Sequence, residues 1–117
     1  MMYIDFVAGD KTYKLRMNTR SVVALEKQLG GNPLAIFGAD GNTIPTVEIM
    51  VAVLHASLQQ YNHGITVNDA YDIFDKWLED GHDTVEFINT ILEIYKASGI
   101  VPKDIETQQE VNTIEKN

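Results

Sequence analysis

The spacing of the apolar residues changes once along this chain, and the change limits the possible folds more than any other feature. Over residues 3–17 apolar side chains alternate with their neighbours, which is the period of a β-strand. From residue 19 they recur every three or four positions, as in amphipathic helices. The sequence therefore predicts an α+β protein, mainly α, in which an N-terminal β-hairpin packs on a bundle of about four helices.

The hairpin is expected at about residues 2–17. Ile4 and Phe6 alternate with other side chains, and Gly9-Asp10 supplies a two-residue turn. A glycine at the first central position favours a type II′ turn, whose twist matches that of the flanking strands. Because an isolated hairpin is only marginally stable in water, one of its faces must pack on the helices.

Four helices should follow, each bounded by residues that cap or break helices. We expect them at about residues 19–29, 46–61, 67–80 and 84–98. Gly30-Gly31 ends the first helix, and Thr66 with Asp69 resembles a capping box before the third. Asp83 with Glu86 gives a similar capping pattern before the fourth. The residues expected in the core are Phe6, Leu15, Leu25, Leu54, Phe74, Trp77, Ile88 and Leu92.

A single domain over residues 1–99 accounts for most of the chain. Its 117 residues, 44% of them hydrophobic, suffice for one core and are too few for two. A helical turn is expected within this domain after Pro33. After Pro102 the chain is polar apart from Ile105, Val111 and Ile114, so we expect residues 100–117 to form a loosely ordered tail.

Charge and composition argue against several classes of protein. The net charge of -8 disfavours nucleic acid and anionic membranes as partners, since both attract Lys and Arg. No apolar run approaches the roughly 20 residues that cross a bilayer, and residues 1–5 lack the layout of a signal peptide. We therefore expect a cytoplasmic location. The absence of Cys excludes disulfides, thiolate metal sites and a Cys nucleophile.

The potential metal ligands do not have the spacing of a known site. No two of His55, His63 and His82 lie four residues apart, the interval that places two imidazoles on one metal. The densest acidic group, around Asp83 and Glu86, lacks the alternating oxygen ligands of an EF-hand loop, and helix capping explains it better. We therefore expect no metal and no other cofactor.

Nucleophile motifs are also missing from the sequence. Ser21, Ser57 and Ser98 lack the glycine-rich elbow that presents a hydroxyl for attack. His55 falls on an apolar helix, where a hydrogen bond within the core or at a contact surface explains it better than a role as catalytic base. These patterns predict a protein that is not an enzyme and has no catalytic residues.

Uneven charge suggests contacts between copies of the chain. Residues 1–27 contain five basic and three acidic side chains, a net charge of +2, which leaves -10 for the rest. The basic end, including Lys14, Arg16 and Arg20, can meet the acidic flank of another copy in a head-to-tail arrangement.

The fourth helix adds a second reason to expect self-association. Beside one apolar stripe it carries another, formed by Phe87, Ile91 and Ile94, which is more than an outer helix of a small monomer needs. We therefore expect these three residues to contact a second copy or a helical partner. The alternative is that the helix lies centrally and buries both stripes within one chain.

Two adjoining stretches resemble a known family. Residues 13–21 read Tyr-Lys-Leu-Arg-Met-Asn-Thr-Arg-Ser, and residues 25–34 read Leu-Glu-Lys-Gln-Leu-Gly-Gly-Asn-Pro-Leu. This progression, with echoes in Tyr71, Ile73, Asp75 and residues 78–81, resembles the small tail assembly chaperones of long-tailed bacteriophages and prophages. The resemblance covers residues 3 to about 99 and consists of structural residues without a catalytic signature.

The resemblance implies a non-enzymatic protein of the infected bacterium's cytoplasm. Such a chaperone binds the tape measure protein, acts with other tail proteins while the tail tube assembles, and is absent from the mature virion. Two other readings of the sequence remain open. One is an acidic inhibitor that mimics the charge of DNA, which a net charge of -8 supports only modestly. The other is a small hydrolase, which requires a cleft with perturbed groups around His55 or His82.

Overall fold

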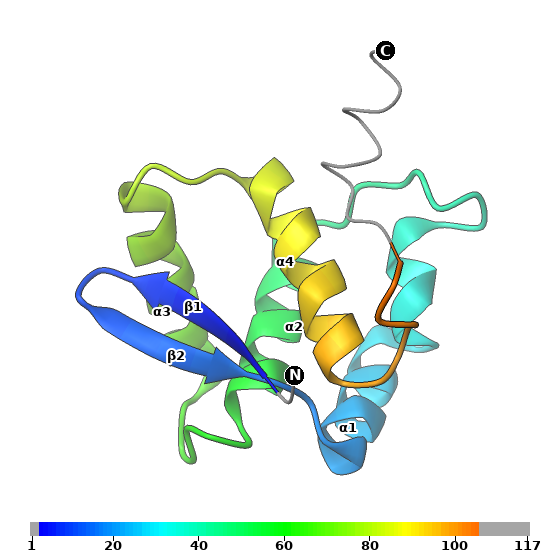
Figure 1. The fold of residues 1–117 in the computed structure, drawn as a ribbon, viewed down its shortest axis with the longest axis horizontal. Helices are drawn as coiled ribbons and strands as arrows, with labels where there is room; N and C mark the ends of the chain where they lie inside the picture. Colours follow the sequence, from blue (N-terminus) through cyan, green and yellow to red (C-terminus); the bar gives the residue numbers. More distant parts are fainter. Residues whose placement is uncertain (1–2, 106–117) are drawn as a thin grey trace.

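The computed structural model describes residues 3–105, which form a hairpin followed by helices (Figure 1). The elements are β1 (Ile4–Ala8), β2 (Lys11–Leu15), α1 (Thr19–Leu29), the 3₁₀ helix η1 (Pro33–Phe37), α2 (Val47–Leu58), α3 (Val67–Glu79) and α4 (Thr84–Ala97). The predicted fold class is therefore confirmed. No helix within these residues is long and apolar enough to span a membrane.

The hairpin has the tight turn that the sequence predicts. β1 pairs antiparallel with β2, with Ile4 opposite Leu15 and Ala8 opposite Lys11. Gly9 has a φ of 65°, and no described residue other than glycine has a positive φ. A type I′ turn needs positive φ at both central residues, so the turn fits type II′. Phe6, Ala8 and Leu15 face the helices and are buried.

Side-chain caps set the beginnings of the helices. Asn18 accepts a hydrogen bond from the Ser21 amide at the start of α1. Thr66 and Asp69 form the expected capping box, and the hydrogen bonds from Thr66 lower the pKa of the Asp69 carboxyl. Asp83 accepts from the Glu86 amide at the start of α4. The capping patterns in the sequence therefore locate these helix boundaries correctly.

α2 is the central helix of the domain. It contacts α1, α3 and α4, and Figure 1 shows α4 crossing in front of it with α3 and α1 on opposite sides. It is buried almost all round, as its mixed apolar sequence requires. It ends at Leu58 and not at the predicted residue 61, and both the amide and the side chain of Asn62 donate to the Leu58 carbonyl.

The packed domain extends slightly beyond the predicted boundary at residue 99. The Ile100 amide donates to the Tyr95 carbonyl over 2.9 Å, and Val101 is buried in the core. The expectation of a loose tail over residues 100–117 is therefore wrong for its first two residues. Its part from residue 106 onward lies outside the described residues.

Candidate functional site

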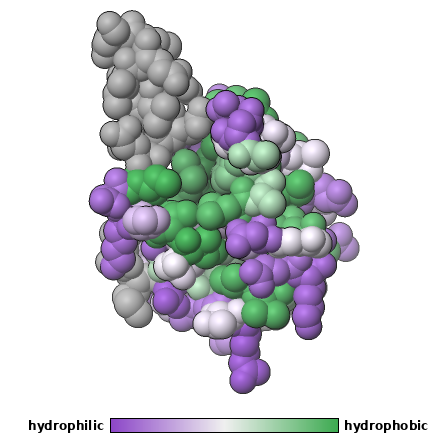
Figure 2. All heavy atoms as spheres, turned by 90° about the vertical axis from the view of Figure 1, so that its right-hand side faces the viewer, coloured by the Kyte–Doolittle hydropathy of each residue, from purple (hydrophilic) through white to green (hydrophobic). Residues whose placement is uncertain are grey.

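An apolar groove lies open on the surface between η1 and α4. We call it the η1–α4 groove, and it encloses about 680 Å³. Its lining comprises Leu34 and Phe37 of η1, residues 38–41 of the following loop, Ile88 and Leu92 of α4, and Val101 and Ile105 near the end of the described chain. On the side of the molecule that carries α1 and η1, hydrophobic residues gather within a hydrophilic rim (Figure 2). The groove can accept apolar side chains of a partner.

Asn32 and Pro33 fix the start of η1, which forms one wall of the groove. Asn32 caps η1 by accepting a hydrogen bond from the Leu34 amide, and Pro33 follows it at the first helical position. The ring of Pro33 is buried, whereas Leu34 is 41% exposed at the groove. In the Asn-Pro-Leu stretch, Pro33 is therefore fixed by burial and Leu34 is exposed to the groove.

Tyr95 joins the two walls of the groove. Its side chain is fully buried, and its hydroxyl donates to the Pro33 carbonyl over 3.0 Å. Its ring also packs edge-on against Phe37, with centroids 6.4 Å apart. Burial raises the pKa of the Tyr95 hydroxyl, because the phenolate loses its hydration. A neutral Tyr95 therefore holds η1 against α4.

We expect Tyr95→Phe to lower the free energy of unfolding by about 1 kcal/mol, since it removes the hydroxyl that donates to the buried Pro33 carbonyl. The wild-type domain should also lose stability as the pH rises above about 10, where the unfolded chain ionises its tyrosines and the folded chain keeps Tyr95 protonated. Urea unfolding at neutral and alkaline pH measures both effects. Tyr71→Phe, at a 40% exposed position, is the control. If the free energy of unfolding falls equally at alkaline pH in Tyr95→Phe and Tyr71→Phe, the role of Tyr95 is contradicted.

The side of α4 that lines the groove is not the side that the sequence predicts to contact a partner. Phe87, Ile91 and Ile94, predicted to contact another chain, are all 0% exposed and belong to the core. That prediction is wrong, because α4 packs on α2 and β1 and covers this stripe within one chain. Leu92, expected in the core, is instead partly exposed in the η1–α4 groove.

The three basic residues predicted to guide self-association have different surroundings. Lys14 is exposed and lies over the Tyr3 ring, with its Nζ 4.9 Å from the centroid. Arg16 is partly buried, and its guanidinium donates to the Ala97 carbonyl and to Gln60 Oε1. Arg20 is exposed. Arg16 thus already has internal partners, and a head-to-tail contact through Lys14 and Arg20 stays a prediction.

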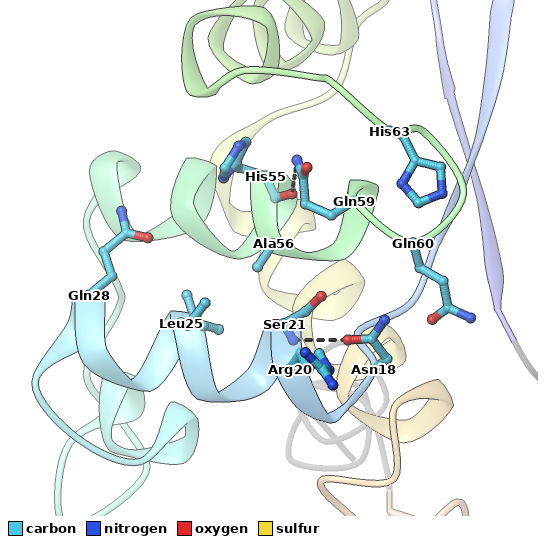
Figure 3. A pocket seen from close by; sticks show the side chains of 11 residues that line it. Asn18, Arg20, Ser21, Leu25, Gln28, His55, Ala56, Gln59, Gln60 and His63 are labelled. Atoms are coloured by element: carbon cyan, nitrogen blue, oxygen red, sulfur yellow. Dashed lines mark hydrogen bonds between the residues drawn. The ribbon is translucent and has the colours of Figure 1, made fainter.

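A second, more polar groove lies between α1 and α2 (Figure 3). It encloses about 420 Å³, with Arg20 and Ser21 on one side and His55 and His63 on the other. The His55 ring lies 3.2 Å from the Ile65 carbonyl through Nε2, and Gln59 donates to the same carbonyl over 2.9 Å. These bonds fasten the loop after α2, so His55 has a structural role.

Three further candidates for chemistry, Ser57, Ser98 and His82, have structural partners. Ser57 is buried and donates to the Leu54 carbonyl, while Ser98 donates to Ile94 and accepts from the Met17 amide. His82 stacks on Trp77 at 4.6 Å between ring centroids. Within residues 3–105 no group of three or more potential ligands is placed to hold a metal ion.

Comparison with known proteins gives one match. The model of a family of unknown function (DUF6096) matches residues 5–116. The chain belongs to this family. The region that matches the DUF6096 model includes both walls of the η1–α4 groove. No curated protein and no solved structure is significantly similar to the chain.

Proposed function

We propose that this DUF6096 protein is a non-enzymatic tail assembly chaperone of a long-tailed bacteriophage or prophage. In this role it binds the tape measure protein in the host cytoplasm, promotes assembly of the tail tube with other tail proteins, and leaves before the tail matures. The single observation that carries the proposal is the η1–α4 groove, because an open apolar surface of this size suits a protein partner.

The resemblance and the groove involve the same part of the chain. The stretch Leu25 to Leu34, which resembles the tail assembly chaperones, forms the last part of α1, its glycine cap and the start of η1. Leu34 is both the last residue of that stretch and an exposed residue of the groove wall. The stretch that resembles the chaperones therefore contributes to the wall of the η1–α4 groove as well as to the fold.

The form of the groove favours a helical client. Leu34 and Phe37 lie three residues apart on η1, and Ile88 and Leu92 lie four apart on α4, so apolar side chains face the groove from both walls. An amphipathic helix binds by placing its apolar face into such a groove. A tape measure protein, being long and helical, offers many such faces.

We expect co-expression with the chain to raise the soluble fraction of the tape measure protein, and Leu34→Asp to remove that effect. A charge placed at the centre of an apolar contact should cost about 2 kcal/mol or more of binding free energy, a loss of roughly thirtyfold in affinity. Soluble client in cleared lysates and its co-purification with the chain are the measurements.

Val23→Asp is the matched control for this experiment. Val23 is 42% exposed, close to the 41% of Leu34, but it lies on α1 outside the groove lining. Circular dichroism should show both variants folded. If the wild-type chain neither solubilises nor retains the client, the proposed function is wrong. If the two variants fail equally, the groove is not the binding surface.

A further inference from the structure

We propose that this chain assembles head to tail, with α3 of one copy docked on α1 of the next, along the groove between α1 and α2. The first observation is a basic face on α1. Arg20 and Lys27 lie seven positions apart, about 10 Å or two helical turns, so both project from the same side of the helix. Both are exposed, and within residues 3–105 neither has an ion pair. Their charges are therefore free to meet acidic groups of a partner.

The groove beside this basic face suits carboxylates. It encloses about 420 Å³, with Arg20 on the α1 side and His63 on the loop after α2 (Figure 3). No Asp or Glu is among the described residues that line it, although the whole chain has a net charge of -8. Its walls instead carry side chains with N–H donors, among them Gln28. Carboxylates can therefore enter it without like-charge repulsion.

The second observation is an acidic face on α3. Asp72, Asp75 and Glu79 are spaced three and four positions apart, so they share one side of the helix. All three are exposed, and none of them has an ion pair in the part of the chain that the structure describes. Lys76, the one cation of α3, lies beside the hairpin turn at Gly9. The three carboxylates therefore face solvent without a counter-charge from their own chain.

The third observation is that the two faces match in spacing. Asp72 and Glu79 are seven positions apart, as Arg20 and Lys27 are. Because the rise per residue is the same in both helices, two charge pairs can form at once when the helices lie side by side. This match favours a second copy over an unrelated acidic protein, since each chain carries both halves of the contact.

The positions of the two faces determine the kind of assembly. α1 and α3 lie on opposite sides of α2, so a single neighbour cannot cover both faces (Figure 1). The contact therefore joins two different surfaces and extends into a ring or an open chain of copies. This inference goes beyond the proposed function and does not depend on it. Neither face contributes to the lining of the η1–α4 groove, so the assembly leaves that groove open to a client.

Sedimentation equilibrium of the purified chain tests the contact without any client. We expect assemblies that grow beyond two copies as the concentration rises and that loosen as salt is added, because the charges are exposed. Arg20→Glu places like charges opposite each other and should raise the dissociation constant roughly tenfold or more. Lys103→Glu makes the same change of charge at an exposed position outside both faces and should leave the constant unchanged. Circular dichroism should show both variants folded.

Charge reversal then tests whether the two faces meet each other. Arg20→Glu with Lys27→Glu should leave the chain monomeric, and so should Asp72→Lys with Glu79→Lys. All four changes in one chain reverse both faces together and should restore the assembly. If that fourfold variant is folded and monomeric, or if either double variant still assembles as the wild-type chain does, these faces do not bind each other and the proposal is wrong.

Two results for the wild-type chain would also overturn the proposal. A strict monomer at millimolar concentration and low salt would show that α1 and α3 do not bind. An assembly that stops at two copies would indicate a closed two-fold contact in place of the head-to-tail one. Since no client is present, failure here leaves the proposed function untouched, and failure of the solubility experiment leaves this contact untouched.

Discussion

Replacing Trp77 by Ala should lower the free energy of unfolding by about 3–5 kcal/mol. Trp77 is only 5% exposed, and its ring lies where the hairpin, α3 and α4 meet. It stacks on Phe6 of β1 at 5.5 Å and packs edge-on against Phe87 of α4, also at 5.5 Å. It also stacks on His82, with ring centroids 4.6 Å apart. Truncation therefore leaves a cavity that no single element can close.

The measurement is urea unfolding followed by circular dichroism, because the substitution removes the chain's only tryptophan and with it the fluorescence signal. Tyr71→Ala is the matched control. Tyr71 lies on the same helix but is 40% exposed, so its loss should cost far less. A loss from Trp77→Ala no larger than that of the control would show that the aromatic cluster does not hold the hairpin to the helices.

Ile91→Asp should prevent the domain from folding. Ile91 is fully buried, and an isolated carboxylate in an apolar core costs several kcal/mol whether it is desolvated as an ion or kept protonated without a partner. That cost is comparable to the whole stability of a small domain, about 5–15 kcal/mol. The soluble yield and the circular dichroism spectrum of the purified variant are the readouts.

Leu92→Asp provides a sharp comparison one residue away. Leu92 is partly exposed in the η1–α4 groove, so this variant should fold. A folded, monomeric Ile91→Asp protein would restore the interpretation of Phe87, Ile91 and Ile94 as a contact surface. Folding of both variants would therefore contradict the core packing described for α4.

The sequence predicts the elements of this fold well because their signals are local. Gly9 marks the hairpin turn, and Thr66, Asp69 and Asp83 mark helix starts through hydrogen bonds to residues three positions away. Such bonds need nothing from the rest of the chain, so their pattern can be read directly. The end of α2 escaped prediction because no glycine caps it, and its C-cap is Gln59.

The candidate site was much harder to predict than the fold. Apolar periodicity shows which faces of α4 avoid water, but not which face meets α2 and which lines a groove. That outcome depends on neighbours far along the chain, so Ile91 and Leu92 could not be assigned in advance. The η1–α4 groove joins residues near 34, 90 and 105, and no spacing rule connects these positions.

The junction between the hairpin and α1 has a consequence for how the chain acquires its structure. Arg16 donates to the Ala97 carbonyl and the Met17 amide donates to Ser98, so each bond closes a loop of 81 residues. The chain entropy of a loop that long must be lost before either bond can stabilise it. During synthesis these two bonds therefore cannot form until α4 has emerged from the ribosome. Folding should accordingly be slower than in a helical bundle that has only local contacts. It should also be completed late in translation.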